Sequence, residues 1–421
     1  MCRFAEWQIC GWDAFNSHIC TTYPAKGVDS YIHKFVFMNI GFDAKRAFHN
    51  NTGLGHYSRT LIRLLADYYP EHEYFLFNPK KSSRYDLKGN NLHEIVPTGF
   101  PDTLLRAAWR SSWIKKDLKR SRIDVYHGLS HEIPIGMNKT GIKSVVTIHD
   151  LIPERYPEQY NPIDVKIYRR KFIYACRQAD KIIAISDQTR QDIMEFYNIP
   201  GEKIVICYQS CSPVFSIMVG EEEKKRIAKK YELPPEFFLS VGSVVERKNL
   251  LNVCKAFFLL RNELNIPLVV IGGGGKYKQQ VKDFILQHDL EKKIIFLSEN
   301  INAKSDPAFL TTADLAVIYQ LAIAMVYPSF FEGFGAPVLE ALWSQLPVIT
   351  SNVSCLPEVG GPGAYYVDPN SATEIAEGMK RIYSDKELVT AMKEKGIEHT
   401  KKFTPSAYTA AIMDVYKSLI V

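Results

Sequence analysis

The chain has no run of about 18 apolar residues of the kind that spans a membrane. Its longest apolar stretch, residues 315–327, is shorter and contains Gln320, so we expect a helix followed by a strand there. The first 37 residues also lack the basic start and the long apolar core of a signal peptide. These absences argue against a membrane span and against a secretory signal.

Cysteine patterns typical of disulfide frameworks and zinc sites are missing as well. The eight cysteines are scattered without any C-x-x-C pair, which indicates reduced thiols in a cytoplasmic protein. Cys207 and Cys211 form one C-x-x-x-C, but no matching pair completes a zinc site. We therefore expect no metal and a cytoplasmic location, at the inner face of the membrane if the protein contacts lipid.

A strong charge of one sign is also lacking. The net charge is +6 over 421 residues, so binding to nucleic acid is not implied. With 46% hydrophobic and 23% charged residues, the composition is ordinary for a soluble globular protein, and the length suits two domains.

Apolar, strand-like segments alternate with helical stretches in both halves of the chain. This alternation predicts an α/β fold with two doubly wound, Rossmann-like parallel sheets. The expected strands are residues 35–42, 74–78, 123–127, 145–149, 181–186, 204–208, 237–241, 267–271, 293–297, 322–327 and 347–351. We expect an extension over 1–37, which a misassigned start would explain, a first domain over 38–215, a second over 216–402, and a terminal helix over 403–421.

One stretch, V-Y-P-S-F-F-E-G-F-G-A-P-V-L-E-A-L-W over residues 326–343, organises the second half. The apolar run over 322–327 predicts a buried strand, the glycines a loop, and Pro337 the start of a helix. Free N–H groups in the first turn of that helix favour a bound phosphate. The expected donors are Ala336, Val338 and Leu339.

Glu332 and Glu340 place two carboxylates around the same helix start. Carboxylates beside a phosphate site suit uncharged diols, which donate hydrogen bonds to carboxylate oxygens. This combination indicates a sugar nucleotide as ligand. From composition alone, two solvated glutamates on an ordinary strand-turn-helix remain an equal alternative.

The frame E-G-F-G-x-P-x-x-E, with Glu332 and Glu340 at its ends, resembles the signature of the retaining glycosyltransferases of family four. That resemblance implies the two-domain GT-B fold, with the terminal helix crossing back to the first domain. It further implies that Glu332 holds the donor sugar, Glu340 holds the ribose diol, and the backbone of Phe334 and Gly335 contacts the sugar or phosphate.

Residues 242–250 read G-S-V-V-E-R-K-N-L after an expected strand. An arginine offers a planar fork and a lysine a point charge, which together suit two phosphates. The frame G-x-x-x-x-R-K-N-L, which starts at Gly242, also resembles family four, and this implies that Arg247 and Lys248 hold the donor diphosphate. A solvated pair is the alternative.

Three further segments lie at expected strand ends of the first half. Gly53 and Gly55 open a helix, and the resemblance implies that they approach the donor or the acceptor, whereas a tight turn is the alternative. The segment V-T-I-H-D with His149 resembles the family's histidine-aspartate segment, whose histidine faces the donor sugar. For His127 we favour a structural role, and for Ser186 a plain helix N-cap.

Residues 106–122 carry seven basic residues against one aspartate, with Trp109 and Trp113 four positions apart. This spacing predicts a helix with both tryptophans on one face. A basic amphipathic helix can lie on an anionic membrane. An ordinary surface helix with its tryptophans in the core is the alternative.

Together these segments predict a glycosyltransferase that uses a sugar nucleotide. The resemblance implies retention of configuration and a hexose donor, with mannose from GDP-mannose favoured because the local likeness is to bacterial mannosyltransferases of surface-polysaccharide assembly. The acceptor would be a glycan or a lipid-linked glycan. No D-x-D motif occurs, which agrees with basic residues in place of a metal cofactor. A GT-B sugar-nucleotide epimerase and a catalytically silent nucleotide-sugar binder remain alternatives.

Overall fold

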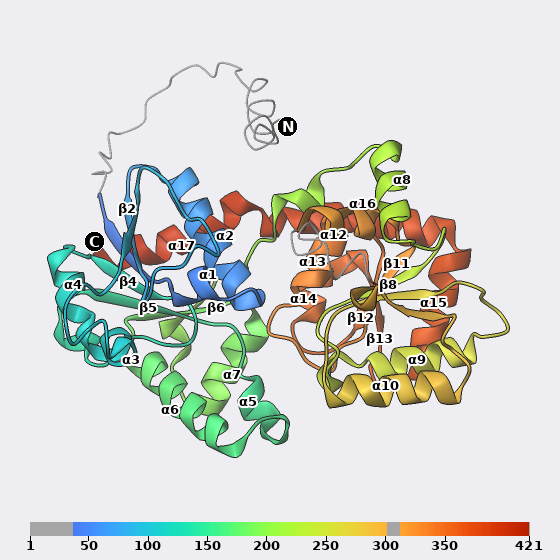
Figure 1. The fold of residues 1–421 in the computed structure, drawn as a ribbon, viewed down its shortest axis with the longest axis horizontal. Coiled ribbons are helices and arrows are strands. Elements are labelled where there is room, and N and C mark those ends of the chain that lie inside the picture. Colours follow the sequence, from blue (N-terminus) through green and yellow to red (C-terminus); the bar gives the residue numbers. More distant parts are fainter. Residues whose placement is uncertain (1–36, 301–311, 421) are drawn as a thin grey trace, which may run out of the picture. The chain divides into compact units, whose positions relative to one another are not determined.

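The computed structural model describes residues 37–300 and 312–420 and contains two parallel β-sheets (Figure 1). The first sheet has the strand order β3-β2-β1-β4-β5-β6-β7, and the second β10-β9-β8-β11-β12-β13. The expected fold class, two Rossmann-like α/β halves, is confirmed. Apart from Phe37, the expected N-terminal extension lies outside the described residues.

The central strands are buried along most of their length because helices connect parallel strands and cover both faces of such a sheet. The first sheet contains β1 (Asn39–Asp43), β2 (Glu73–Phe77), β3 (Leu92–Ile95), β4 (Val125–Gly128), β5 (Lys143–Ile148), β6 (Lys181–Ala184) and β7 (Ile204–Ile206). The second contains β8 (Phe238–Val241), β9 (Leu268–Ile271), β10 (Ile294–Phe296), β11 (Ala324–Tyr327), β12 (Val348–Ser351) and β13 (Ala364–Val367).

Helices link the strands in both halves. In the first half they are α1 (Lys45–His49), α2 (Gly53–Tyr68), α3 (Arg106–Ala108), α4 (Lys115–Arg120), α5 (Ile152–Arg155), α6 (Pro162–Gln178) and α7 (Asp187–Tyr197). The later ones are α8 (Glu221–Lys230), α9 (Leu250–Leu259), α10 (Lys276–Gln287), α12 (Thr312–Leu321), α13 (Ala336–Trp343), α14 (Leu356–Gly360), α15 (Ala372–Ser384), α16 (Lys386–Thr400) and α17 (Pro405–Ile420). None of the described helices is long and apolar enough to span a bilayer.

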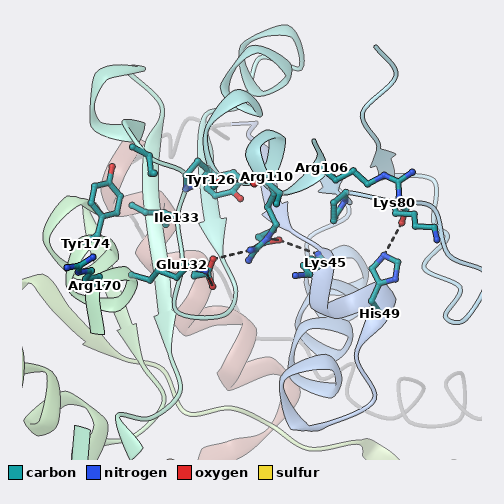
Figure 2. Close-up of a pocket in the computed structure, with 17 residues that line it drawn as sticks. Lys45, His49, Lys80, Arg106, Arg110, Tyr126, Glu132, Ile133, Arg170 and Tyr174 are labelled. Carbon is teal, nitrogen blue, oxygen red and sulfur yellow. Dashed lines mark hydrogen bonds and ion pairs between the residues drawn. The ribbon is translucent and has the colours of Figure 1, made fainter. Parts of the chain in front are cut away.

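Each sheet has one point at which the strand order reverses. In the first sheet this switch point lies between β1 and β4, and in the second between β8 and β11. Open α/β sheets bind ligands beyond the carboxyl ends of the strands at such points. A cavity of about 880 Å³ lies at the first switch point, with Asp43 at the end of β1 and Tyr126 in β4 among its lining residues (Figure 2).

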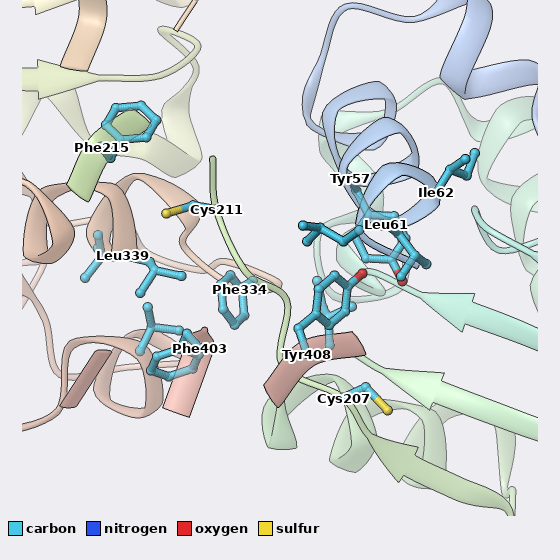
Figure 3. Packing of buried hydrophobic residues seen from close by; sticks show 14 of the residues in the cluster. Tyr57, Leu61, Ile62, Cys207, Cys211, Phe215, Phe334, Leu339, Phe403 and Tyr408 are labelled. Carbon is cyan, nitrogen blue, oxygen red and sulfur yellow. The ribbon is translucent and has the colours of Figure 1, made fainter. Parts of the chain in front are cut away.

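A large buried cluster contains side chains from both sheets and from α17 (Figure 3). Tyr57 of α2 packs near Tyr408 of α17, with ring centroids 6.2 Å apart. Phe334, in the loop after β11, packs near Phe403, which lies just before α17. Their ring centroids are 5.8 Å apart. Because α17 also contacts α2 and β5, the last helix packs on the first half of the chain.

The expectation of one continuous helix within 106–122 is wrong. The segment consists of the short α3, a π-helical turn over Trp109–Trp113, and α4. Trp109 is fully buried and donates to the Asp117 carboxylate at 2.7 Å, so it belongs to the core. A π-turn changes the angular spacing of residues, and the four-residue interval therefore does not define one α-helical face here.

Candidate functional site

Two loops meet at the switch point of the second sheet. The first follows β8 and runs from Gly242 to Asn249, and the second follows β11. The Phe330 N–H donates to the Arg247 carbonyl at 2.9 Å, and the Asn249 side chain donates to the Pro328 carbonyl at 2.8 Å. These bonds hold the two loops together. Gly242 has a φ of +140°, a conformation that glycine adopts readily and other residues rarely do.

Glu332 lies between the two basic residues of the first loop. Its carboxylate is 2.9 Å from the Arg247 guanidinium and 2.6 Å from the Lys248 ammonium. All three side chains are largely buried, with exposed fractions of 8%, 14% and 17% respectively. Because two cations face one carboxylate, the cluster retains one positive charge. The structure thus brings Glu332 together with Lys248 and Arg247, which lie 84 and 85 positions before it in the sequence.

Burial and ion pairing act in opposite directions on the titration of these groups. Burial alone would raise the pKa of Glu332, but Lys248 and Arg247 hold it below its ordinary value. The pKa of Arg247 is raised, since the nearby Glu332 outweighs the effect of burial. The pKa of Lys248 is lowered by burial despite its contact with Glu332. A cationic lysine here depends on an anionic neighbour, which Glu332 supplies.

Tyr327 belongs to the same cluster, although the sequence marked it only as part of a strand. Its hydroxyl donates to the Glu332 carboxylate at 3.0 Å and accepts from the Lys248 ammonium. Burial raises the pKa of Tyr327 well above its ordinary value, so the hydroxyl stays protonated. Its position at the carboxyl end of a strand before the glycine loop was the available sequence signal.

Glu340 lies in α13, at the other end of the signature. It accepts a hydrogen bond from the Tyr319 hydroxyl at 3.0 Å. Burial raises the pKa of the Glu340 carboxyl to about 7. Glu340 therefore differs from Glu332: near neutral pH one carboxyl is held ionised by cations, whereas the other lies close to its titration point.

The start of α13 agrees only in part with the expected phosphate site. Gly335 caps the helix in a left-handed conformation with a φ of +84°. The Val338 N–H is not free, because it donates to the Gly335 carbonyl at 2.9 Å. The expected set of three free donors is therefore incomplete.

His149 follows β5 and lies against the glycine loop of the signature. A Cβ atom added at Gly333 would be 2.2 Å from the His149 carbonyl oxygen, so only glycine fits. The His149 Nε2 lies 2.8 Å from the Leu129 carbonyl, which can only accept, and Nδ1 is therefore the acceptor nitrogen. Burial lowers the pKa of His149 to about 3, so the ring is neutral.

His127 has a structural role, as expected. Its two ring nitrogens lie 2.7 Å from the Tyr416 hydroxyl and 2.8 Å from the Thr147 hydroxyl, and the side chain is fully buried. Burial lowers its pKa to about 3. His127 thereby connects β4 to α17 and leaves no ring nitrogen for a substrate.

Only one glycine of the pair in the first half, Gly55, is required for steric reasons. A Cβ at Gly55 would lie 1.9 Å from the Asn50 carbonyl oxygen, whereas a Cβ at Gly53 would meet nothing within 4 Å. In the described structure neither glycine contacts the cluster around Glu332. Their assignment to donor or acceptor binding stays a prediction.

Ser186 is the expected N-cap of α7 and has a second contact. Its hydroxyl accepts from the Thr189 N–H at 3.1 Å and donates to the Gly333 carbonyl at 2.7 Å. Glu358 of α14 accepts from the first two N–H groups of the same helix, those of Asp187 and Gln188, at 2.7 and 3.0 Å. The start of α7 is therefore satisfied by residues of the second sheet's loops, which sequence reasoning missed.

The geometry agrees with comparisons to known proteins. A family model described as Glycosyl transferases group 1 matches residues 221–399, and one described as Glycosyltransferase Family 4 matches residues 51–210. Two parallel sheets, each with one switch point, together with these matches, support a group 1 glycosyltransferase of the GT-B fold.

Two curated relatives and one solved structure give the level of similarity. The chain is 29% identical over 389 residues to the O-antigen chain mannosyltransferase B of Escherichia coli, covering 87% of this chain and 96% of that protein. It is 29% identical over 287 residues to the Escherichia coli serotype-specific mannosyltransferase WbdA, covering 66% of this chain and 34% of that longer protein. The Anabaena HepE structure with UDP and glucose superimposes with a TM-score of 0.68 at 13% identity, covering 91% and 100% of the two chains.

Proposed function

We propose that this protein is a retaining hexosyltransferase that moves mannose from GDP-mannose to a glycan or lipid-linked acceptor in bacterial surface-polysaccharide assembly. The names of the Escherichia coli relatives support the sugar and the pathway. The single observation that carries the proposal is the buried contact of Glu332 with Arg247 and Lys248 at the second switch point.

Arg247 and Lys248 stabilise the diphosphate as it leaves the donor. Negative charge develops on the leaving group in the transition state, and fixed cations in a water-poor site stabilise it strongly. The cluster has one more positive than negative charge, and its members lie on loops tied by backbone hydrogen bonds. No metal is needed in this scheme.

Glu332 orients the donor sugar through its hydroxyls, and Glu340 accepts from the ribose diol. The Phe334 and Gly335 backbone contacts the sugar or the phosphate, and the neutral His149 offers Nδ1 as an acceptor to a sugar hydroxyl. Retention follows a front-face route, in which the leaving diphosphate takes the proton of the acceptor hydroxyl.

Thermal unfolding with GDP and with UDP tests the donor site. A nucleotide present at about 100 times its Kd should add about 2.7 kcal/mol of stability, and we expect this for GDP rather than UDP. Incubation with GDP-mannose and an oligosaccharide acceptor, followed by NMR of the product anomer, tests retention. No stabilisation by either nucleotide would overturn the donor site, and isomerisation of a nucleotide sugar without acceptor would favour an epimerase.

A further inference from the structure

The cavity at the first switch point is separate from the cluster around Glu332, and none of its lining residues belongs to that cluster. It is bordered by residues that follow β1 and β2, by the loop after β4, by α3 and by α6 (Figure 2). It lies beyond strand ends at a switch point, which is where open α/β sheets bind ligands.

The cavity has an excess of positive charge. Six cationic side chains and two carboxylates line it: Lys45, Lys80, Arg106, Arg110, Arg170, Lys171, Asp43 and Glu132. Arg110 is ion-paired with both carboxylates. Its Nε lies 3.0 Å from Asp43 and its Nη1 lies 3.0 Å from Glu132. Lys171 lies 3.2 Å from Glu132 as well.

The other four cations have no carboxylate partner within the described part of the chain. Lys45, Lys80, Arg106 and Arg170 form no ion pair there, and their side chains are exposed. Burial and repulsion by Arg110 and Arg46 lower the pKa of Lys45. Cations that repel one another around a cavity are stabilised by an anion between them.

Apolar side chains are exposed beside these cations. Phe100, Leu104 and Leu105, in the turn before α3, are 84%, 69% and 48% exposed. Ile135, which lines the cavity, is 58% exposed. Leu105 directly precedes Arg106, which lines the cavity, so cationic and apolar groups adjoin at this rim. Exposed apolar residues at the rim of a cavity favour a ligand that is itself partly apolar.

We propose that this cavity binds a phosphate or diphosphate group that links the acceptor glycan to a lipid, and that the apolar rim contacts the lipid chain. The identification of this ligand as the acceptor rests on the proposed function. The assignment of anion and lipid binding to the cavity rests on the charges and the exposed apolar residues.

Calorimetric titration with inorganic pyrophosphate, in the presence of saturating GDP, tests the anion site. The variant R106A/R170A should bind pyrophosphate at least about tenfold more weakly than the wild type, since each good contact to a charged group contributes about 1.5–3 kcal/mol. A matched control, K116A/K119A, removes two exposed cations outside the cavity from α4 and should bind like the wild type. Equal affinity in all three proteins, or equal losses in both variants, would overturn the proposal.

Farnesyl diphosphate tests the lipid part of the proposal. It should bind the wild type at least about tenfold more tightly than pyrophosphate, because apolar contact adds about 25 cal/mol per Å². L104S/L105S should abolish that preference while retaining pyrophosphate binding. If the wild type shows no preference for the farnesyl group, the lipid assignment is overturned.

Failure of the proposed function gives a different pattern. A protein that binds pyrophosphate in the cavity but binds neither GDP nor UDP would retain the anion site and lose the donor assignment. A protein that binds GDP and transfers mannose, with no effect of R106A/R170A on acceptor KM or on pyrophosphate affinity, would retain the transferase and lose the cavity proposal.

Discussion

Each of the two switch points of the molecule holds a largely buried ion cluster. The central residue is an anion in one cluster and a cation in the other. After β8 and β11, the carboxylate of Glu332 lies between Arg247 and Lys248. After β1 and β4, the guanidinium of Arg110 lies between Asp43 and Glu132. One fold therefore supports both arrangements of charge at the same topological position.

The consequences of the two arrangements differ. In the second half both cations are largely buried and in contact with Glu332, which suits a water-poor site for charge stabilisation. In the first half Arg110 and Lys171 together balance the two carboxylates, and the remaining cations border an open cavity. The two sites therefore differ in burial: the cations of the second half are enclosed, whereas most cations of the first half are exposed at the cavity.

The largest expected effect comes from removing the central carboxylate of the second half. Glu332→Gln should lower the free energy of unfolding by about 3–5 kcal/mol, since breaking a buried pair leaves uncompensated charge. Urea unfolding at pH 7 measures it. The lowered pKa of Glu332 means that its contribution is lost as pH falls through that pKa, so the difference from wild type should shrink in acid. Glu236→Gln, at an exposed position, is the control. Equal stability of the two variants would show that the buried ion pairs of Glu332 do not stabilise the fold.

Removal of a cation from the same cluster should affect catalysis most. Lys248→Ala should raise the barrier to transfer by about 2.7–4 kcal/mol, a loss of about 10²–10³ in kcat, by analogy with a lost oxyanion donor. Initial rates with saturating donor measure it. Lys255→Ala, on the exposed face of α9, should transfer at the wild-type rate. Transfer by Lys248→Ala at that same rate would remove Lys248 from the mechanism.

Arg110→Lys tests the ion cluster at the switch point of the first half. An ammonium keeps the charge but cannot reproduce the fork that bonds to both Asp43 and Glu132, so about 1.5–3 kcal/mol of stability should be lost. Chemical denaturation measures the change. Arg170→Lys, at an exposed cation without an ion pair, should stay within about 0.5 kcal/mol of wild type. If the two variants were equally stable, the Arg110 contacts would contribute nothing specific.

The smallest expected effect per pH unit is the titration of Glu340. Its pKa is raised from 4.5 to about 7, so between these pH values the folded protein binds more protons than the unfolded chain. Stability should therefore fall as pH rises through this range, by at most about 1.4 kcal/mol per pH unit. Unfolding curves of wild type and Glu340→Gln across this range measure it. A slope that is unchanged in Glu340→Gln would show that another group titrates.

The sequence predicted the central strands better than the edge strands. β4, β9, β11 and β12 are completely buried, and their continuous apolar runs were visible. Of the four edge strands in the described sheets, β7 and β10 were predicted, whereas β3 and β13, which are mostly half-buried, were missed. An edge strand has one neighbour and partial cover, so it needs no continuous apolar run.

In the candidate site, too, some features were predictable from local sequence and others were not. Glu332, Arg247 and Lys248 were identified from local frames whose residue types suit phosphates and sugars. Contacts made by Ser186 and Glu358 with distant loops carry no local signature, since they depend on how the two sheets' loops meet. The broken helix over 106–122 was missed for a related reason, because the buried Trp109 and its bond to Asp117 stabilise a π-turn.

The sequence by itself determined the two α/β halves and the residue types of the cluster around Glu332, because hydrophobic periodicity and short motifs are local properties. Only the tertiary structure decided which charges neutralise one another. Asp43 and Arg110 are 67 positions apart, and Arg247 and Glu332 are 85 apart. An ion pair depends on distance in space, and strand order at the two switch points sets that distance.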